Sequence, residues 1–166
     1  MTIIEFEKKL IDADNVSICE NIKSFEASTR DANGNNILHY YIMNKKNINF
    51  PIDLFLSLLD SFNFDYDAKQ NKGQKRSPLA LTILYNEKEM FNALMNRCVD
   101  VENPDVNGNT PLFNATMEYK GDSYYIENLL KNHADPNKVN KYNVSPVKLA
   151  YTIANTDVRK LFANGC

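Results

Sequence analysis

The side chains that could serve as nucleophiles, general bases or metal ligands are few in this sequence. The two histidines are His39 and His133, and the three cysteines, Cys19, Cys98 and Cys166, are far apart. No pair of cysteines has the spacing of zinc ligands, and no Ser–His or Cys–His pair has sequence support as a catalytic pair. An odd number of distant cysteines is typical of free thiols in a reducing compartment. The sequence therefore predicts no catalytic residue, no metal site and no cofactor.

Charged side chains gather in two neighbouring places. Three acids crowd together, without the spacing of a calcium-binding loop: Asp60, Asp65 and Asp67. We interpret them as turn and surface acids rather than as cation ligands. A short basic run follows them: Lys69, Lys72, Lys75 and Arg76. This run is either a solvated loop tip or a basic site that attracts a partner with an acidic patch, which we call an electrostatic hook. The sequence leaves both interpretations open.

The composition is that of an ordinary globular domain. The 166 residues are 43% hydrophobic and 24% charged, and their formal net charge is −2. A charge this small gives no basic field for nucleic acid. The sequence has no apolar run of the roughly 18 residues that a membrane span needs, and its N-terminus does not read as a signal peptide. We therefore expect a cytoplasmic protein that binds neither nucleic acid nor a membrane.

The elements that must position these side chains recur along the chain. A helix start, in which Ser or Thr caps a helix whose first residue is Pro, occurs three times: Ser77-Pro78-Leu79, Thr110-Pro111-Leu112 and Ser145-Pro146-Val147. The copies are 33 and 35 residues apart, and a weaker copy begins at Asn36. A turn residue precedes each copy: Gly34, Gly73, Gly108 and Asn143. The pattern predicts four similar units, each opening with a short helix.

A second landmark follows each helix start. Each unit carries a Leu-led segment that we interpret as the end of a second helix with an apolar stripe, and these segments begin at Leu59, Leu94, Leu129 and Leu161. The residue four positions later should adopt left-handed backbone: Asn63, Cys98, His133 and Gly165. Because the two landmarks stay in step, the sequence predicts stacked helix pairs joined by projecting turns.

These motifs resemble the ankyrin repeat, whose signature is a Thr-Pro-Leu-His-x-Ala box and a Leu-Leu-x-x-Gly-Ala-Asp-x-Asn segment at a period of about 33 residues. The second segment is matched best by the stretch from Leu129 to Asn137. The resemblance covers residues 31–166. It implies an all-α solenoid of stacked helix-turn-helix pairs with projecting turns, and a structural hydrogen-bonding role for His39.

The resemblance also implies how the single domain of residues 1–166 is divided. We expect a capping helix pair in residues 1–30, roughly at 2–11 and 15–25, and an insertion near 45–50 inside the first full repeat. Tyr41 replaces the small residue of the box, which predicts a splayed first repeat. The approximate repeats are 31–63, 64–98, 99–133 and 134–166.

The function that the resemblance implies is recognition of another protein without catalysis. We call the projecting turns fingers. The expected contacts lie on the tips of these fingers and on the exposed side of each first helix, which together would form a rigid concave surface. The finger positions are Asn33, Asn35, Lys72, Gln74, Lys75, Arg76, Val106, Asn107, Asn109, Lys141 and Tyr142. The helix positions are Asn44, Tyr85 and Glu118.

A small repeat stack of this kind would act by occupying its partner. We expect a monomer when free, and two specific roles follow from the sequence. One is an immunity protein that neutralises a toxin, and the alternative is a virus- or pathogen-derived inhibitor of a host signalling protein. An enzyme built on a helical scaffold is the third hypothesis and the least favoured.

Overall fold

The computed structural model describes Thr2, Glu5 and residues 26–45, 52–61, 64–152 and 157–163. The helix pair predicted within residues 1–30 and the insertion near 45–50 lie almost entirely outside the described residues. Within the described ranges the chain forms helices and turns and contains no β-strand. The all-α prediction is therefore confirmed.

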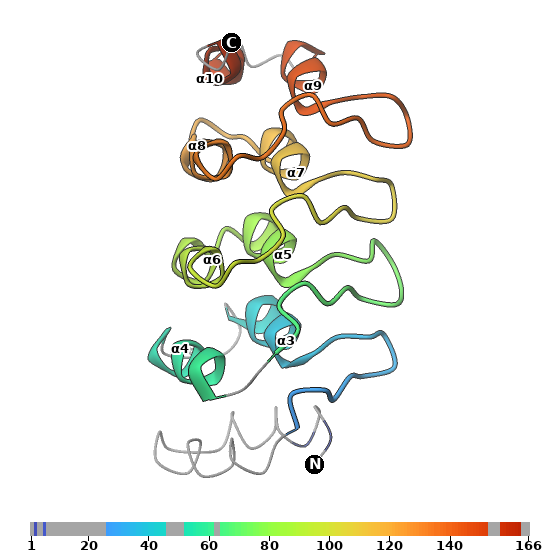
Figure 1. The fold of residues 1–166 in the computed structure, drawn as a ribbon, viewed down its shortest axis with the longest axis vertical. Helices are drawn as coiled ribbons and strands as arrows, with labels where there is room; N and C mark the ends of the chain where they lie inside the picture. Colours follow the sequence, from blue (N-terminus) through green and yellow to red (C-terminus); the bar gives the residue numbers. More distant parts are fainter. Residues whose placement is uncertain are drawn as a thin grey trace.

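The helices form pairs that pile up in sequence order (Figure 1). One column contains the first helix of each pair: α3 (Ile37–Asn44), α5 (Pro78–Tyr85), α7 (Pro111–Met117) and α9 (Pro146–Thr152). The other column contains the second helices: α4 (Ile52–Ser61), α6 (Lys88–Met95), α8 (Tyr124–Lys131) and α10 (Asp157–Ala163). Each pair falls inside one of the four repeat ranges expected from the sequence. The repeat boundaries themselves stay a prediction.

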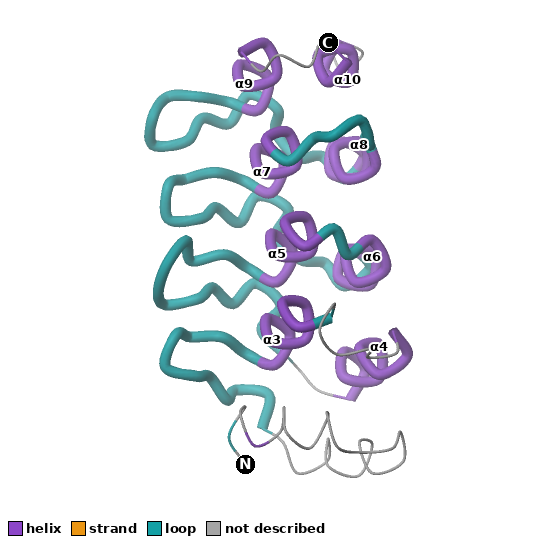
Figure 2. Tube along the Cα trace, turned by 180° about the vertical axis from the view of Figure 1, so that it is seen from behind, coloured by secondary structure: helices purple, strands orange, loops and turns teal. Residues whose placement is uncertain are grey.

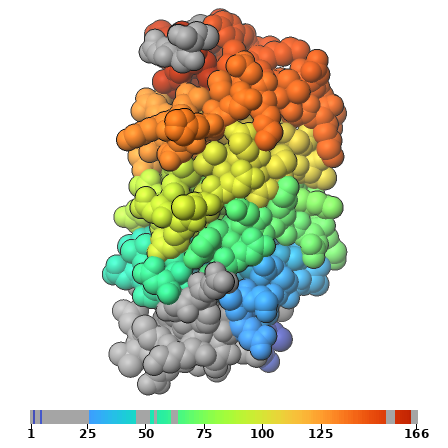
Figure 3. Space-filling model, viewed as in Figure 1, coloured from blue at the N-terminus to red at the C-terminus, as the bar shows by residue number. Residues whose placement is uncertain are grey.

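The turns between the pairs project as fingers from the side of the first helices (Figure 2). In the space-filling view the repeats follow one another as bands along the long axis of the molecule (Figure 3). No helix in the part of the chain that the structure describes is long and apolar enough to cross a membrane.

The first helices begin where the caps were predicted. The hydroxyl groups of Ser77, Thr110 and Ser145 each accept a hydrogen bond from the backbone N–H three residues later, at 3.2–3.3 Å. In the first repeat the carboxamide of Asn36 does the same for the N–H of His39 at 3.1 Å. The caps satisfy donors that a helix start leaves open, so a local sequence signal fixes four helix starts.

Left-handed backbone occurs at the predicted helix ends that the structure describes. Cys98 has a φ of 53° and His133 a φ of 65°, while Asn63 and Gly165 lie outside the described residues. Because left-handed backbone crowds a Cβ atom, these two positions are occupied at some cost in free energy.

The turn position two residues before each cap is also left-handed. It is Gly34 (φ 80°), Gly108 (φ 82°) and Asn143 (φ 59°) in three of the fingers. In the second finger the equivalent residue is Lys75 (φ 54°), and Gly73 (φ 64°) lies among the extra residues of that longer turn. Gly73 is a turn residue before its cap, as expected, but the inserted residues of the longer turn place it two positions before the equivalent of Gly34 and Gly108.

The core is a continuous apolar seam between the two columns. Phe91 and Leu94 of α6 and Leu129 of α8 have no exposed surface, and Ile126 is 1% exposed. Tyr41 is buried in the first repeat, and its ring lies 5.2 Å from the ring of Phe55 on α4. The splay of the first repeat that a large residue at position 41 predicts stays a prediction.

Candidate protein-binding surface

The histidine of the box, His39, is part of the architecture. Its side chain is completely buried, and its Nε2 atom lies 3.1 Å from the carbonyl oxygen of Arg76 in the next finger. Burial lowers the pKa of His39 to about 4, so the ring is neutral near pH 7. His133 lies exposed at the end of α8. The structural role expected for His39 is confirmed by these contacts.

The three acids of the possible cation site lie in separate contacts. Asp60 forms an ion pair with Arg97, and a carboxylate oxygen of Asp67 accepts a hydrogen bond from the N–H of Asp100 at 2.9 Å. Asp65 accepts one from the N–H of Asp67 at 3.1 Å. Among the described residues no group of three or more His, Cys, Asp or Glu side chains could hold a metal ion.

Adjacent fingers are bonded to one another through their backbones. The N–H of Asn71 donates to the carbonyl of Asn33 at 2.6 Å, and the N–H of Lys141 donates to that of Asn107 at 3.0 Å. Between these contacts, the N–H of Val106 donates to the carbonyl of Gln74 at 2.8 Å. The fingers therefore form a connected sheet-like edge in which tip side chains are presented from a fixed backbone.

Two of the predicted contact residues are buried in that edge. Asn35 is 5% exposed and accepts a hydrogen bond from Gln70, while its own amide donates to Asp31. Asn109 is 9% exposed and is bonded to Asp105 and Asn140 in the same manner. Both amides connect neighbouring fingers and present little surface to a partner, and their part in binding stays a prediction.

The other predicted finger residues present at least part of their surface. Tyr142 is the most open large hydrophobic residue there, with 71% of its surface exposed. Val106 and Asn107 are half-buried, and the amide of Asn107 donates to Gln74 at 3.1 Å. The remaining residues are exposed, except for Arg76, which is half-buried: Asn33, Lys72, Gln74, Lys75, Arg76 and Lys141.

The basic run does not act as one unit. The ammonium group of Lys69 donates to the carbonyl of Pro104 at 2.7 Å and so joins two fingers. Lys72 and Lys75 lie exposed on the second finger. Arg76 lies at the base of that finger and lines a small hollow between α5 and α7. Only Lys72 and Lys75 thus have the open position that an electrostatic hook requires.

The helix residues that were expected to contact a partner are less exposed than two of their neighbours. Asn44, Tyr85 and Glu118 are all half-buried, whereas the residues preceding two of them, Leu84 and Met117, are 38% and 47% exposed. Both stand seven residues after a cap and 33 residues apart. The signal that could have found them is an apolar residue at the same register in two consecutive repeats.

Leu84 and Met117 flank the hollow between α5 and α7. We call this the inner face and define it by the residues that line the hollow: Arg76, Ala80, Leu84, Asn114, Met117 and Glu118. It combines two exposed apolar side chains with one basic and one acidic residue. Aliphatic groups with a few polar ones are the usual composition of a recognition site.

Asn114 lies buried beneath this surface, with 5% of its surface exposed. Neither atom of its amide has a hydrogen-bond partner within the described ranges. The residues at the same register in the other repeats are Tyr40, Leu81 and Leu149. None of these three residues has a side-chain amide. The third repeat alone therefore carries an unsatisfied amide at this position, and such groups are rare in folded proteins.

The family model that describes ankyrin repeats (3 copies) matches residues 47–140 of the chain. A search of curated proteins found no match. The matched residues make up more than half of the sequence, and they include α4, the pairs α5–α6 and α7–α8, and the caps at Ser77 and Thr110. The chain belongs to the ankyrin-repeat family. Its repeats make it a protein-interaction module.

Proposed function

We propose that this chain is a non-catalytic binding protein that holds a partner protein against the inner face and the adjoining finger tips. The observation that supports this proposal best is the exposure of Leu84 and Met117 at equal register on either side of an unsatisfied, buried Asn114. Exposed apolar side chains and an unpaired amide both lower the stability of the free protein, so a partner that covers them gains affinity.

The finger tips add a second zone of contact. Tyr142 is open on the fourth finger, and tyrosine is among the residues that contribute most to protein interfaces. Lys72 and Lys75 on the second finger favour a partner with an acidic patch, because opposite charges speed association. The backbone bonds between fingers mean that little ordering entropy opposes binding.

The action that fits this surface is occupancy of the partner. Neutralisation of a toxin by an immunity protein and inhibition of a host signalling protein are both actions of this kind, and each stays a prediction. So do the cytoplasmic location, the monomeric state and the absence of catalysis. The identity of the captured partner distinguishes the first two roles.

The test is capture of the partner by the full chain and by matched variants. A Leu84→Ser and Met117→Ser double variant should lose at least about 2 kcal/mol of binding free energy while its helicity is retained. The control is Tyr151→Ser, because Tyr151 is also exposed but its ring lies beside Arg159 and outside the inner face. Equal capture by the wild type and the double variant would contradict the proposal.

A further inference from the structure

A second, larger hollow adjoins the inner face. It has a volume of about 150 Å³ and lies where α5 and α7 end and the loops to their second helices begin. It shares Leu84 and Glu118 with the inner face, so a protein bound there would lie beside its opening. Its apolar wall consists of Ile83, Leu84 and Ala115.

Tyr125 is one of the residues that line this pocket, and its buried hydroxyl is unsatisfied. Tyr125 on α8 is 8% exposed, and its hydroxyl finds no hydrogen-bond partner among the described residues. The residues at the same register on the earlier second helices are Phe55 and Met90, both buried. The core at this register therefore does not need a hydroxyl group. A polar group that is buried without a partner destabilises the free protein, which points to a ligand that satisfies it.

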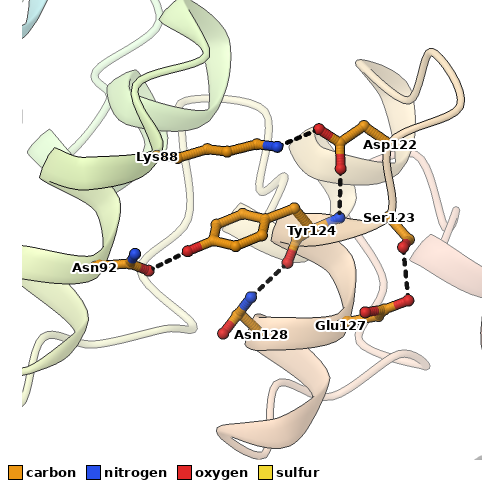
Figure 4. A network of polar contacts seen from close by, with 7 residues as sticks. All are labelled: Lys88, Asn92, Asp122, Ser123, Tyr124, Glu127 and Asn128. Atoms are coloured by element: carbon orange, nitrogen blue, oxygen red, sulfur yellow. Dashed lines mark hydrogen bonds and ion pairs between the residues drawn. The ribbon is translucent and has the colours of Figure 1, made fainter.

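Asp122, which lines the pocket, is held in place by contacts with Lys88 of α6 and with Tyr124 at the start of α8 (Figure 4). The ammonium group of Lys88 lies 2.5 Å from a carboxylate oxygen of Asp122 and 4.7 Å from the ring centre of Tyr124. The other carboxylate oxygen of Asp122 accepts from the N–H of Tyr124 at 3.1 Å. The hydroxyl of Tyr124 donates to Asn92 at 2.6 Å. These contacts fix the position of the Asp122 carboxylate at the pocket.

The charges around the pocket favour a cation. Glu118 and Asp122 line it together with Lys120, and Lys88 is paired with Asp122. Burial, then the charges of Glu87 and Asp122, raise the pKa of Tyr125. Among the lining residues, acids therefore outnumber bases by two to one. Glu118 has no ion pair within the part of the chain that the structure describes.

We propose that this pocket receives one arginine side chain of the partner protein. The inference rests on the proposed function, because it assigns a chemical feature to the same partner. The methylene groups of the arginine would pack against Ile83, Leu84 and Ala115. Its guanidinium group would lie against the tyrosine rings, pair with Glu118 and donate to the hydroxyl oxygen of Tyr125. Arginine suits such a site better than lysine, because its planar cation stacks on aromatic rings and donates in several directions.

The experiment is a titration of the full chain with N-acetyl-L-arginine amide, followed by ¹H–¹⁵N NMR. We expect saturable shifts of the amide signals of Ala115 and of residues 118–122. The same amide of citrulline, which is neutral and of similar shape, should bind at least about fivefold more weakly. The lysine amide should lie between the two. Equal binding of the arginine and citrulline amides, or shifts that do not saturate, would overturn the proposal.

Two variants locate the binding within the pocket. Tyr125→Phe and Glu118→Gln should each weaken binding of the arginine amide about threefold or more, and Tyr125→Phe should also raise the midpoint of urea unfolding. Glu89→Gln is the matched control, because Glu89 is an exposed acid of α6 that does not line the pocket. If the two pocket variants bind the arginine amide as tightly as the control variant does, the proposal of an arginine site in this pocket is wrong.

This titration needs no partner, so the two proposals can fail separately. Loss of the arginine signal with intact dependence of capture on Leu84 and Met117 would reject the pocket alone. The converse result would reject the inner face and leave the pocket standing.

Discussion

The Nε2 atom of His39 and the carbonyl oxygen of Arg76 lie 3.1 Å apart, which ties the first box to the second finger. The same ring reaches the N-cap of its own helix, because the N–H of Asn36 lies 3.2 Å from Nδ1. One buried imidazole therefore bonds the start of α3 and the neighbouring repeat at once. A neutral ring with its proton on Nε2 satisfies both contacts.

Stability should fall as the pH is lowered through the range in which His39 would take up a proton. Its pKa is lowered to about 4 in the folded protein from 6.5. Below pH 6.5 the unfolded chain binds a proton that the folded chain does not, so the stabilisation is present above that pH and is lost towards pH 4. The loss amounts to about 3 kcal/mol over the whole interval. Urea unfolding at pH 7.5, 6.5, 5.5 and 5.0 measures it.

The matched variant for this prediction is His39→Gln. It should be less stable than the wild type at pH 7.5, and its free energy of unfolding should change less between pH 7.5 and 5.5. A wild-type stability that rises on acidification over this interval would contradict the buried, neutral assignment of His39.

Replacement of Gly34 by alanine should be much more damaging than replacement of Gly73. Both glycines have positive φ angles, 80° and 64°. A Cβ atom at Gly34 would lie 2.5 Å from the backbone nitrogen of Asn71, whereas a Cβ atom at Gly73 would meet nothing within 4 Å. We expect about 1 kcal/mol of destabilisation for Gly73→Ala from backbone strain. For Gly34→Ala we expect about 2 kcal/mol more from the clash.

Thermal and urea unfolding followed by circular dichroism at 222 nm gives both values. The backbone strain is similar at the two sites. The difference between the two variants in the free energy of unfolding therefore measures the cost of the clash between the first two fingers. Equal costs would mean that the contact between Asn33 and Asn71 is absent in solution.

Replacement of Asn114 by leucine should stabilise the free protein. The variant copies the residue that the neighbouring repeats carry at this register, Leu81 and Leu149, and it removes two unpartnered amide atoms. We expect a gain of about 1 kcal/mol in the free energy of unfolding, together with weaker capture of the partner. A destabilised Asn114→Leu variant would show that the amide is satisfied in the free protein.

Asn109→Leu is the control for this prediction. Asn109 is equally buried, but its amide is bonded to Asp105 and Asn140. Its replacement removes the hydrogen bonds of Asp105 Oδ2 and Asn140 Nδ2, and it should cost about 2 kcal/mol or more. If Asn114→Leu raises the free energy of unfolding and Asn109→Leu lowers it, the amide of Asn109 serves folding and that of Asn114 serves binding.

Association with the captured partner should depend on salt through the second finger. Lys72→Gln should lower the association rate about twofold or more at low ionic strength and reduce its salt dependence. Lys131→Gln removes the same charge from the exposed surface of α8 and serves as the control. Stopped-flow or surface-based kinetics at 20 mM and 500 mM salt measure both. An identical response of the two variants would argue against an electrostatic hook on this finger.

The repeat architecture could be predicted from the sequence because its signals act over a few residues. Ser77, Thr110 and Ser145 cap helices through bonds to residues only three positions away, and Cys98 and His133 end helices by their own backbone angles. In the second finger Lys75 takes the place of Gly34, and a pattern of turn residues does not distinguish it from Gly73 when residues are inserted.

The binding surface could be predicted only in part. Tyr142 and the lysines of the second finger are open as expected, because a finger tip contacts little besides its neighbour's backbone. Asn33 and Asn35 are two residues apart in the same turn, yet one is exposed and the other is buried. The difference arises from Gln70 of the next repeat, which covers Asn35 and bonds to it.

The amino-acid sequence alone thus predicts the four helix pairs, their caps and the order in which they stack. The packing of one repeat against the next sets which polar groups are satisfied and which apolar groups are left open: the bonded Asn109 against the unpaired Asn114, and the exposed Leu84 and Met117 beside the pocket of Tyr125. A cap or a turn is settled by bonds within one short segment. The exposure or satisfaction of a side chain depends on atoms that a different repeat brings against it.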